Sequence, residues 1–362
     1  MKTDLYMIYG DSYKQMAKAI LEAAHVAEDI QNPDAKIALK PNLVLDSHPD
    51  QGATTHPELL AGAIEYLREH GFNRIVIMES SWIGCLTDAA YEAAGYRQLC
   101  DDYDVPFIDL QKDTWKTYDA RGVKIKVCDQ AMNVDYMINF PVLKGHCQTS
   151  ITCALKNNKG LIPNVEKRRF HTMGLHKPIA HLNTVVPINF ILVDNICGDL
   201  DFEEGGNPVV MNRVLGGFDP VLIDAFVCET MGYDVDDVPY IRIAEQLGVG
   251  TADTSKAHIV ALNEPTQSVD VHLTYRVRNL STYTDPVDAC SACYGSLIHA
   301  LNRMNERGSL KRHRHKIAIG QGYRQKTGAI GVGNCTRRFK SCVHGCPPKA
   351  SDILEFLEEK WD

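Results

Sequence analysis

The chain has 362 residues, of which 44% are hydrophobic and 23% charged, and its formal net charge at pH 7 is −8. This is the composition of an ordinary globular protein with room for one large domain or two smaller ones, and the negative charge argues against general nucleic-acid binding. No apolar run is long enough to cross a bilayer and no basic-then-apolar leader is present, so we expect a soluble, cytoplasmic protein without a membrane partner. The 12 cysteines are then expected to be reduced thiols, some of them metal ligands.

Strand-like and helix-like patterns alternate through the first half, which is typical of an α/β layer fold. The expected strands are 4–9, 36–43, 74–78, 107–110 and 135–140, and the expected helices are 12–30, 56–70 and 87–102. For the second helix the sequence predicts a capping box of Thr55 and Glu58, with Gly71 after the last turn. Lys40 and Asn42 lie at the carboxyl end of a strand, where ligands collect in doubly wound sheets.

The segment 141–185 is a cationic insert in an acidic chain. It carries seven lysines and arginines against one acid, Glu166, which gives it a formal charge of +6. Such an insert is expected to attract an anionic small molecule. If its first part were helical, one side would carry most of the polar residues, namely His146, Thr149, Thr152, Lys156 and Asn157.

Residue chemistry suggests roles for this insert and for the strand end. We predict His146 as an acid/base, with Lys156 and Lys40 as the other catalytic residues. The predicted substrate contacts are Asn42, Thr149, Thr152, Asn157, Arg168, Arg169 and His171. The alternative interpretation of the basic run is an exposed connecting loop, because charged runs are usually solvated.

The second half continues the alternation. The sequence predicts a strand at 189–193, a helix that begins at Asp219 and Pro220 and ends near 232, another helix at 238–247 and a strand at 258–262. We place a boundary near residue 255. The expected architecture is a Rossmann-like layered sheet flanked by helices, spanning 1–255 with the insert, and a smaller α/β C-terminal lobe, 256–362, which carries the cysteine cluster.

The C-terminal lobe contains the cysteines with the most informative spacing. Cys290 and Cys293 open a predicted helix, and Cys346 precedes the last one; a helix start lowers the pKa of a thiol through its oriented N–H groups. The predicted metal ligands are Cys290, Cys293, Cys335 and Cys346, with Cys342 as a substitute. This set suits an iron–sulfur cluster or a four-thiolate zinc, and the spacing does not choose between them. The alternative is a group of buried cysteines or a lone redox pair.

Seven motifs occur together along the chain: Lys40-Pro41-Asn42-Leu43, Thr55-His56-Pro57-Glu58, Lys144-x-His146, Thr152-x-x-Leu155-Lys156-Asn157, Gly160-Leu161-Ile162-Pro163, Asp219-Pro220 with Asp224, and Gly345-Cys346-Pro347-Pro348. Together they resemble the prokaryotic family catalogued as domain of unknown function 362. The resemblance implies an α/β domain whose members often occur with iron–sulfur modules. The chain has no eight-cysteine ferredoxin segment, so a cluster would have to be built into the domain itself. Gly145 stands where the family usually has a threonine between the lysine and the histidine.

These observations predict an iron–sulfur enzyme of anaerobic metabolism, an oxidoreductase or a lyase. Its 4Fe-4S cluster would face the insert across a cleft and act on an anionic small molecule by electron transfer or Lewis-acid catalysis. A ferredoxin-like electron donor and a homodimer are the allowed protein partners. Two alternatives stay open: a non-redox ligand-binding protein with a structural zinc–thiolate site, and a metal-dependent isomerase with the histidine ligands His146, His171, His176 and His181.

Overall fold

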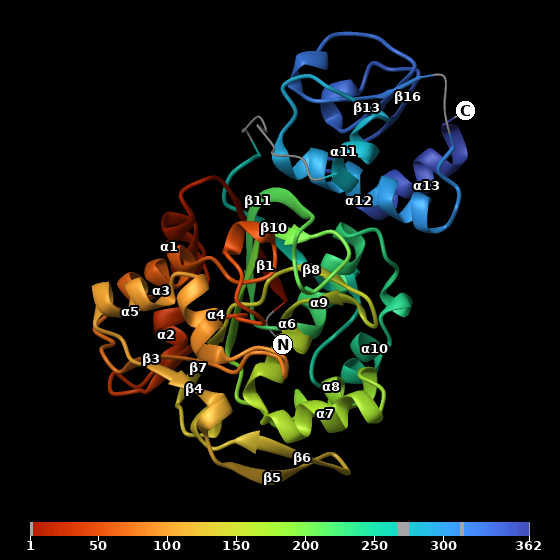
Figure 1. Cartoon of the computed structure of the whole chain (residues 1–362). Helices are drawn as coiled ribbons and strands as arrows, with labels where there is room; N and C mark the ends of the chain where they lie inside the picture. Colours follow the sequence, from red (N-terminus) through yellow and green to blue (C-terminus); the bar gives the residue numbers. More distant parts are fainter. Residues whose placement is uncertain (1–2, 266–274, 312–314, 362) are drawn as a thin grey trace.

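An eight-stranded mixed sheet forms the centre of the main lobe in the computed structural model, which describes residues 3–265, 275–311 and 315–361 (Figure 1). The strands, in their order across the sheet, are β12 (His258–Ala261), β1 (Asp4–Tyr9), β11 (Pro208–Gly217), β10 (Phe190–Asp199), β7 (Tyr136–Asn139), β2 (Ile37–Lys40), β3 (Ile75–Glu79) and β4 (Phe107–Asp109). The stretch from β10 to β4 is parallel, whereas β11 runs antiparallel to both of its neighbours. The α/β architecture predicted from the sequence is confirmed.

Helices cover both faces of this sheet, and the side chains of each strand alternate between the two layers. Ile37 and Leu39 of β2 pack into one hydrophobic core with α1, α3 and α5, while Ala38 packs into the other with α8, α9 and α10. Figure 1 shows the two groups of helices on opposite sides of the strands. The helices of the main lobe are α1 (Tyr13–Ala23), α2 (Val26–Ile30), α3 (Pro57–Glu69), α4 (Thr87–Ala93), α5 (Tyr96–Tyr103), α6 (Ala154–Asn157), α7 (Asn164–Thr172), α8 (His176–Leu182), α9 (Pro220–Thr230) and α10 (Pro239–Gln246).

Two helices that the sequence predicts as continuous are each divided in the structure. The predicted helix 12–30 divides at His25, whose φ of 52° is left-handed, and the helix at 87–102 divides at Gly95, whose φ is 79°. The predicted capping box before α3 is wrong: His56 is the N-cap and no side chain caps the helix. The Thr55 hydroxyl instead accepts from the Asn42 amide at 2.8 Å and donates to the Phe140 carbonyl at 2.8 Å, which ties the loop after β2 to the end of β7.

The first part of the insert is a β-hairpin and not a helix, so the helical spacing of His146 and Thr152 does not place them on one helix face. Strands β8 (Lys144–His146) and β9 (Ser150–Thr152) pair antiparallel, with Ser150 at a positive φ of 63°. The short α6 begins only after this hairpin. The β-branched residues Thr149, Ile151 and Thr152 favour the extended chain over the helix.

Several strands of the main lobe were absent from the sequence-based expectation. Strands β5 (Trp115–Ala120) and β6 (Val123–Cys128) form a separate hairpin at the end of the main lobe remote from the C-terminal lobe (Figure 1). Strand β11, which lies between β1 and β10 in the main sheet, was missed as well. Its first five residues alternate between partly buried and buried, and its last five are all buried.

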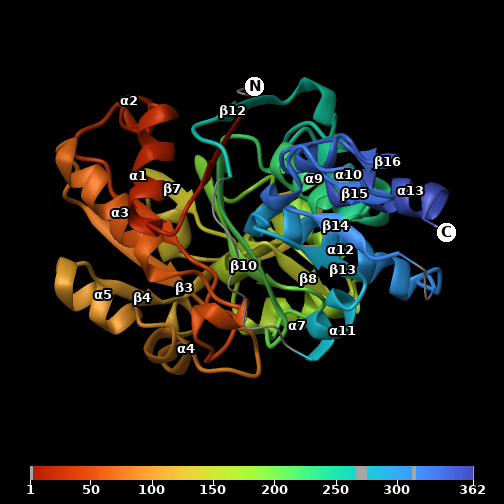
Figure 2. The ribbon, with the colours of Figure 1, turned by 90° about the horizontal axis from the view of Figure 1, so that it is seen from above.

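The C-terminal lobe has its own small parallel sheet and hydrophobic core. Its elements are α11 (Tyr275–Ser281), β13 (Thr284–Pro286), α12 (Ser291–Glu306), β14 (Ile317–Ile319), β15 (Ile330–Val332), β16 (Ser341–Val343) and α13 (Ala350–Lys360). Figure 2 shows α12, α13 and the strands of this lobe grouped together, and α12 packs on β11. The placement of strand 258–262 in this lobe is wrong, because β12 pairs with β1 in the main sheet. The division into 1–255 and 256–362 stays a prediction.

The last helix begins at Ala350, four residues after Cys346, and buries Ile353, Leu354 and Leu357 as the sequence predicts. Within the described part of the chain, no helix combines the length and the apolar character needed to span a bilayer.

Candidate functional site

A cavity of about 220 Å³ opens beyond the carboxyl ends of β2 and β3. In chain order, the next strand of the main sheet after β4 is β7. It pairs with β2 on the side opposite to β3. The connections from β2 and β7 therefore leave in different directions, and such a switch point is where open α/β sheets bind ligands. Asn42 follows β2, Glu79 and Ser80 end β3, and the insert that follows β7 supplies the opposite wall.

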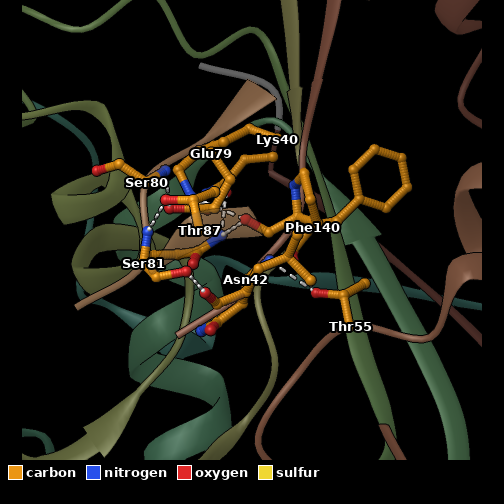
Figure 3. A network of polar contacts seen from close by, with 12 residues as sticks. Lys40, Asn42, Thr55, Glu79, Ser80, Ser81, Thr87 and Phe140 are labelled. Carbon is orange, nitrogen blue, oxygen red and sulfur yellow. Dashed lines mark hydrogen bonds and ion pairs between the residues drawn. The ribbon is translucent and has the colours of Figure 1, made fainter. Parts of the chain in front are cut away.

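A buried ion pair between Lys40 and Glu79 forms the floor of this cavity (Figure 3). The Lys40 side chain is fully buried, and its ammonium also donates to the Pro41 carbonyl at 2.9 Å. Burial disfavours the charged form of both groups, which raises the pKa of Glu79 and lowers that of Lys40, while each supplies the charge that stabilises the other. The Ser80 amide donates to Glu79 at 2.8 Å and fixes the carboxylate.

Four lysines line the cavity, against only two carboxylates, those of Glu79 and Glu203. The lysines are Lys144, Lys156, Lys159 and Lys167. We call this cavity the lysine cavity. Burial lowers the pKa of Lys144, Lys156 and Lys167 to about 7 each. Excess positive charge in a partly enclosed space favours an anionic ligand.

Each of these lysines except Lys159 has a defined polar partner in the described residues. Lys167 donates to the Ser80 carbonyl at 2.8 Å, and Lys144 donates to the Glu203 carbonyl at 2.9 Å. Lys156 bonds the Thr152 hydroxyl at 2.8 Å and lies 3.3 Å from the Glu203 carboxylate. Lys159 has no hydrogen-bond or ion-pair partner among residues 3–265, 275–311 and 315–361, so its ammonium is available to a ligand.

His146 lies behind Glu203 and does not line the cavity. Its Nδ1 accepts from the backbone amides of Gln148 at 3.0 Å and Thr149 at 3.2 Å, so the proton is on Nε2, which donates to the Glu203 carboxylate. Burial, together with the charge of Lys156, lowers the pKa of His146 to about 4. The imidazole is therefore neutral at pH 7 and orients Glu203, which is a positioning role.

This arrangement gives the fold a specific dependence on pH. The unfolded chain protonates His146 near pH 6.5, whereas the folded chain does so only near pH 4. A base with a lowered folded pKa binds fewer protons in the folded state, so the free energy of unfolding falls as the pH drops from about 6.5 to about 4, by roughly 2–3 kcal/mol. Replacing His146 by Gln should remove this contribution from the slope in urea unfolding at pH 7, 6 and 5, whereas buried His299, whose pKa is lowered to about 3, should keep contributing its own.

The matched control for this prediction is His25→Gln, because the His25 side chain is 69% exposed. That variant should keep the wild-type slope. An unchanged slope in His146→Gln would show that His146 is not the group that titrates.

Two buried aspartates of α9 position the insert and the helix itself. Asp219 caps α9 by accepting from the amides of Val221 and Leu222, as its sequence motif predicts. Asp224 accepts from the amides of Ala154 at 2.7 Å and Leu155 at 3.1 Å, which open α6. The motif that joins Asp219 and Asp224 therefore fixes the orientation of Lys156 through backbone hydrogen bonds.

The loop between β10 and β11 connects this cavity to the C-terminal lobe. Glu203 faces the lysines, while Asp201 lies 3.0 Å from Arg276 and accepts from Asn302 of α12 at 2.9 Å. A Cβ at Gly145 would lie 2.6 Å from the Asp201 backbone. Glycine at position 145 is therefore required by the close approach of this loop.

The structure brings together some of the predicted site residues. Those that line the lysine cavity are Asn42, Thr152, Lys156, Asn157 and His171. Lys40 lies beneath it, bonded to Glu79. Three others face elsewhere: the Thr149 hydroxyl donates to the Ile151 carbonyl at 3.1 Å, Arg168 is exposed, and Arg169 pairs with Glu166.

Sequence reasoning missed most of the charged groups of the cavity. They are Glu79, Lys144, Lys159, Lys167 and Glu203, together with Ser80 and Trp82. Glu79 and Ser80 carried a usable signal, because they end a predicted strand. Lys167 could be separated from Arg168 and Arg169 only by the rotational position of α7, which buries Lys167 and Phe170 one turn apart.

The predicted metal ligands gather in the C-terminal lobe. Four thiols, those of Cys290, Cys293, Cys335 and Cys346, line one cavity of about 280 Å³, which we call the cysteine cavity. Cys342 does not line it; its sulfur lies 4.0 Å from the imidazole of His344.

Local structure places these four thiols from three separate segments. Cys290 is the N-cap of α12 and Cys293 lies in its first turn, as predicted. Burial nevertheless raises the pKa of the Cys293 thiol, so desolvation outweighs the effect of the helix start. Arg324 hydrogen-bonds the Cys335 thiol, and the Gln321 amide donates to the Cys290 sulfur at 3.3 Å.

Three glycines allow the backbone to surround this cavity. Gly320, Gly333 and Gly345 have φ values of 115°, 85° and 140°, which side-chain-bearing residues rarely adopt. A Cβ at Gly333 would lie 4.0 Å from the Cys293 sulfur. The glycines therefore leave room among the thiols.

Among the described residues, the lysine cavity and the cysteine cavity have no lining residue in common, so these residues do not form the predicted single cleft between insert and cysteines. In the described part of the chain, no three His, Cys, Asp or Glu side chains are arranged to hold one metal ion. The histidines proposed for an isomerase face different partners: His146 bonds Glu203, His176 stacks on Tyr240, and His181 bonds the Ala120 carbonyl.

Comparisons with known proteins place the chain in a family. A thylakoid-associated protein of Synechocystis sp. is 23% identical over 243 residues, which cover 64% of this chain and 74% of that protein. The lactate racemase apoprotein from Thermoanaerobacterium thermosaccharolyticum aligns with a TM-score of 0.35 and 14% identity over 52% of this chain and 50% of its own length. A Thermotoga maritima protein aligns with a TM-score of 0.37 and 13% identity over 72% of this chain and 63% of its own length.

The alignments to both solved structures span less than two thirds of those chains. The family model that describes domain of unknown function 362 matches residues 37–229, which include β2, β3, the insert and α9. The chain therefore belongs to the family catalogued as domain of unknown function 362.

Proposed function

We propose that this protein is an iron–sulfur oxidoreductase that acts on an anionic small molecule bound in the lysine cavity. The observation that carries the proposal is the convergence of four cysteines from three segments on one cavity. Thiolates are the ligands of iron–sulfur clusters, and Cys290, Cys293, Cys335 and Cys346 would hold the cluster. Such a cluster supplies one-electron transfer.

We propose a cluster in preference to the zinc alternative. Zinc–sulfur bonds of about 2.3 Å in a tetrahedral site bring the four sulfurs within about 4 Å of one another. The described thiols line a common cavity but form no group suited to a single ion. A cluster of several irons needs a wider arrangement of ligands than one ion does.

The separation of the two cavities favours electron transfer over Lewis-acid catalysis. A Lewis acid must contact the atom that it polarises, and the lysine cavity shares no lining residue with the cysteine cavity. Electrons can pass between groups that do not touch. Helix α12 begins at the cysteines and carries Asn302, which bonds the loop that holds Glu203. A ferredoxin-like protein remains the predicted electron donor.

Metal analysis of the full chain after anaerobic purification tests the proposal. Iron and acid-labile sulfide in similar amounts, with little zinc, are the expected result. About one zinc per chain, whose removal unfolds the C-terminal lobe, would identify a structural zinc site instead. A protein that stays free of iron after anaerobic reconstitution would contradict the proposal.

The anion site is tested with sulfate, whose charge does not change near neutral pH. Because the pKa values of Lys144, Lys156 and Lys167 are about 7, part of this lysine set is neutral at pH 8. A bound anion favours the charged amines, so calorimetry at pH 8 should show proton uptake, with an affinity that falls as the pH rises from about 6 to 9.

Replacing Lys159 by Ala should weaken sulfate binding by about tenfold or more, because this ammonium makes no ion pair or hydrogen bond with the described residues. Lys177→Ala is the matched control, since Lys177 is exposed on α8 and does not line the cavity. An affinity that is independent of pH and of Lys159 would place the anion elsewhere.

A further inference from the structure

A third cavity, of about 340 Å³, lies between the edge of the main sheet and the C-terminal lobe. Residues of β1, β11, β12 and α9 form its main-lobe side, and the segment Cys346 to Lys349 forms the other. It shares Glu264, Pro265 and Cys346 with the cysteine cavity, so the two adjoin. We call it the arginine cavity.

Arg213 is the charged group on which this cavity is centred. Its side chain belongs to β11, is only 3% exposed, and lines the cavity. Its donors meet neutral oxygens: Asn195 at 2.7 Å, Thr230 at 3.3 Å and the Tyr9 hydroxyl. Among residues 3–265, 275–311 and 315–361, no carboxylate lies within ion-pair distance of its guanidinium.

A buried cation without a counter-charge is costly, and folded proteins normally pair it with an anion. The other cations near Arg213 are compensated or neutral. Lys349 is paired with Glu229, and burial lowers the pKa of His299 to about 3, which leaves that imidazole uncharged. The uncompensated charge is therefore that of Arg213.

About half of the rest of the lining is apolar, and the polar half includes Glu264, which is exposed and makes no ion pair with Arg213 among the described residues. Met7, Phe226, Ile259 and Pro347 provide walls around Arg213. The planar guanidinium fork matches a carboxylate, which it can bind through two parallel hydrogen bonds. A ligand with one carboxylate and a small apolar body satisfies both parts of this lining.

We propose that the arginine cavity binds a small carboxylate with an apolar body, whose carboxylate pairs with Arg213 and whose body lies against Phe226 and Ile259. Because Cys346 lines both cavities, the ligand would lie beside the cysteine cavity. This site is distinct from the lysine cavity, with which it has no lining residue in common. The inference does not depend on which metal the cysteines hold.

Calorimetry of the anaerobically purified full chain with butyrate tests the inference, with butylamine as a ligand of similar shape and opposite charge. One butyrate per chain is expected to bind, and butylamine is not. Arg213→Gln should weaken butyrate binding at least about tenfold. Ala261→Phe should do the same without altering the core, because Ala261 is exposed on the edge strand β12 and lines the cavity.

Lys159→Ala separates this site from the lysine cavity. It should weaken sulfate binding and leave butyrate binding unchanged, while Ala261→Phe should do the reverse. Absence of butyrate binding tighter than about 10 mM in the wild type would overturn the inference, as would binding that survives Ala261→Phe. Binding of sulfate in place of butyrate, lost in Ala261→Phe, would overturn the assignment to a carboxylate.

Discussion

Replacing Cys335 by Ser is expected to remove the bound iron and its visible absorbance, whereas replacing Cys342 by Ser is expected to leave both unchanged. The two cysteines are seven residues apart in the sequence, but only Cys335 lines the cysteine cavity. A serine hydroxyl is a poor substitute for a thiolate, which is the ligand that iron–sulfur clusters require. The measurement is the iron content and the absorption spectrum of both variants after parallel anaerobic reconstitution.

Cys342→Ser controls for the loss of a thiol in the same lobe. Its sulfur lies on β16 near His344 and contributes to no cavity wall shared with the other four cysteines. Equal iron loss in both variants would mean that the lobe is damaged unspecifically or that the ligand set is different.

Replacing Glu79 by Gln is expected to destabilise the fold by about 3–5 kcal/mol, because it leaves Lys40 as a buried charge without its partner. Glutamine keeps one oxygen, which cannot accept from both the Ser80 amide and the Lys40 ammonium in this geometry, so the wall of the lysine cavity should also loosen. Chemical denaturation at pH 7 measures the change in the free energy of unfolding.

Glu69→Gln is the control for this prediction. Glu69 lies 2.6 Å from Lys18 in an ion pair on the surface, and its side chain is 58% exposed. Loss of such a pair costs about 0–1 kcal/mol. If Glu79→Gln costs no more than Glu69→Gln, then Lys40 is neutral in the folded protein and the ion pair does not form the floor of the cavity.

Hydrophobic periodicity was enough to predict most strands of the main sheet and the helices α3, α9 and α10. In each of these elements the apolar residues recur with the period of a helix or of a strand. Residues such as Asp219, which caps α9, and Gly71, which follows α3, mark the ends of helices. The hairpin β8–β9 was misread because a few polar residues fit a helical spacing as well as an extended one. Its conformation depends on contact with the Asp201 loop, which lies far away in the sequence.

A site residue was predictable where it comes directly after a predicted strand or belongs to a sequence motif. Asn42 at the end of β2, and Lys156 and Asn157 in the insert, lie in the lysine cavity as predicted. Glu203 was not predictable, because only the folding of the β10–β11 loop onto the insert brings it to His146. Arg213 was missed because a charged residue inside a buried strand has no local sequence signal for its partner.

The most direct test of the central claim, that four thiols hold an iron–sulfur cluster, is alkylation of the native full chain followed by mass spectrometry. Cys346 and Cys147 are both exposed in the structure, so without a cluster both should react, with Cys346 the slower of the two because burial raises the pKa of its thiol. With the cluster bound, we expect Cys147 to be alkylated rapidly while Cys346 stays protected, together with Cys290, Cys293 and Cys335, until a chelator removes the iron. Rapid alkylation of Cys346 in iron-containing protein would contradict this claim.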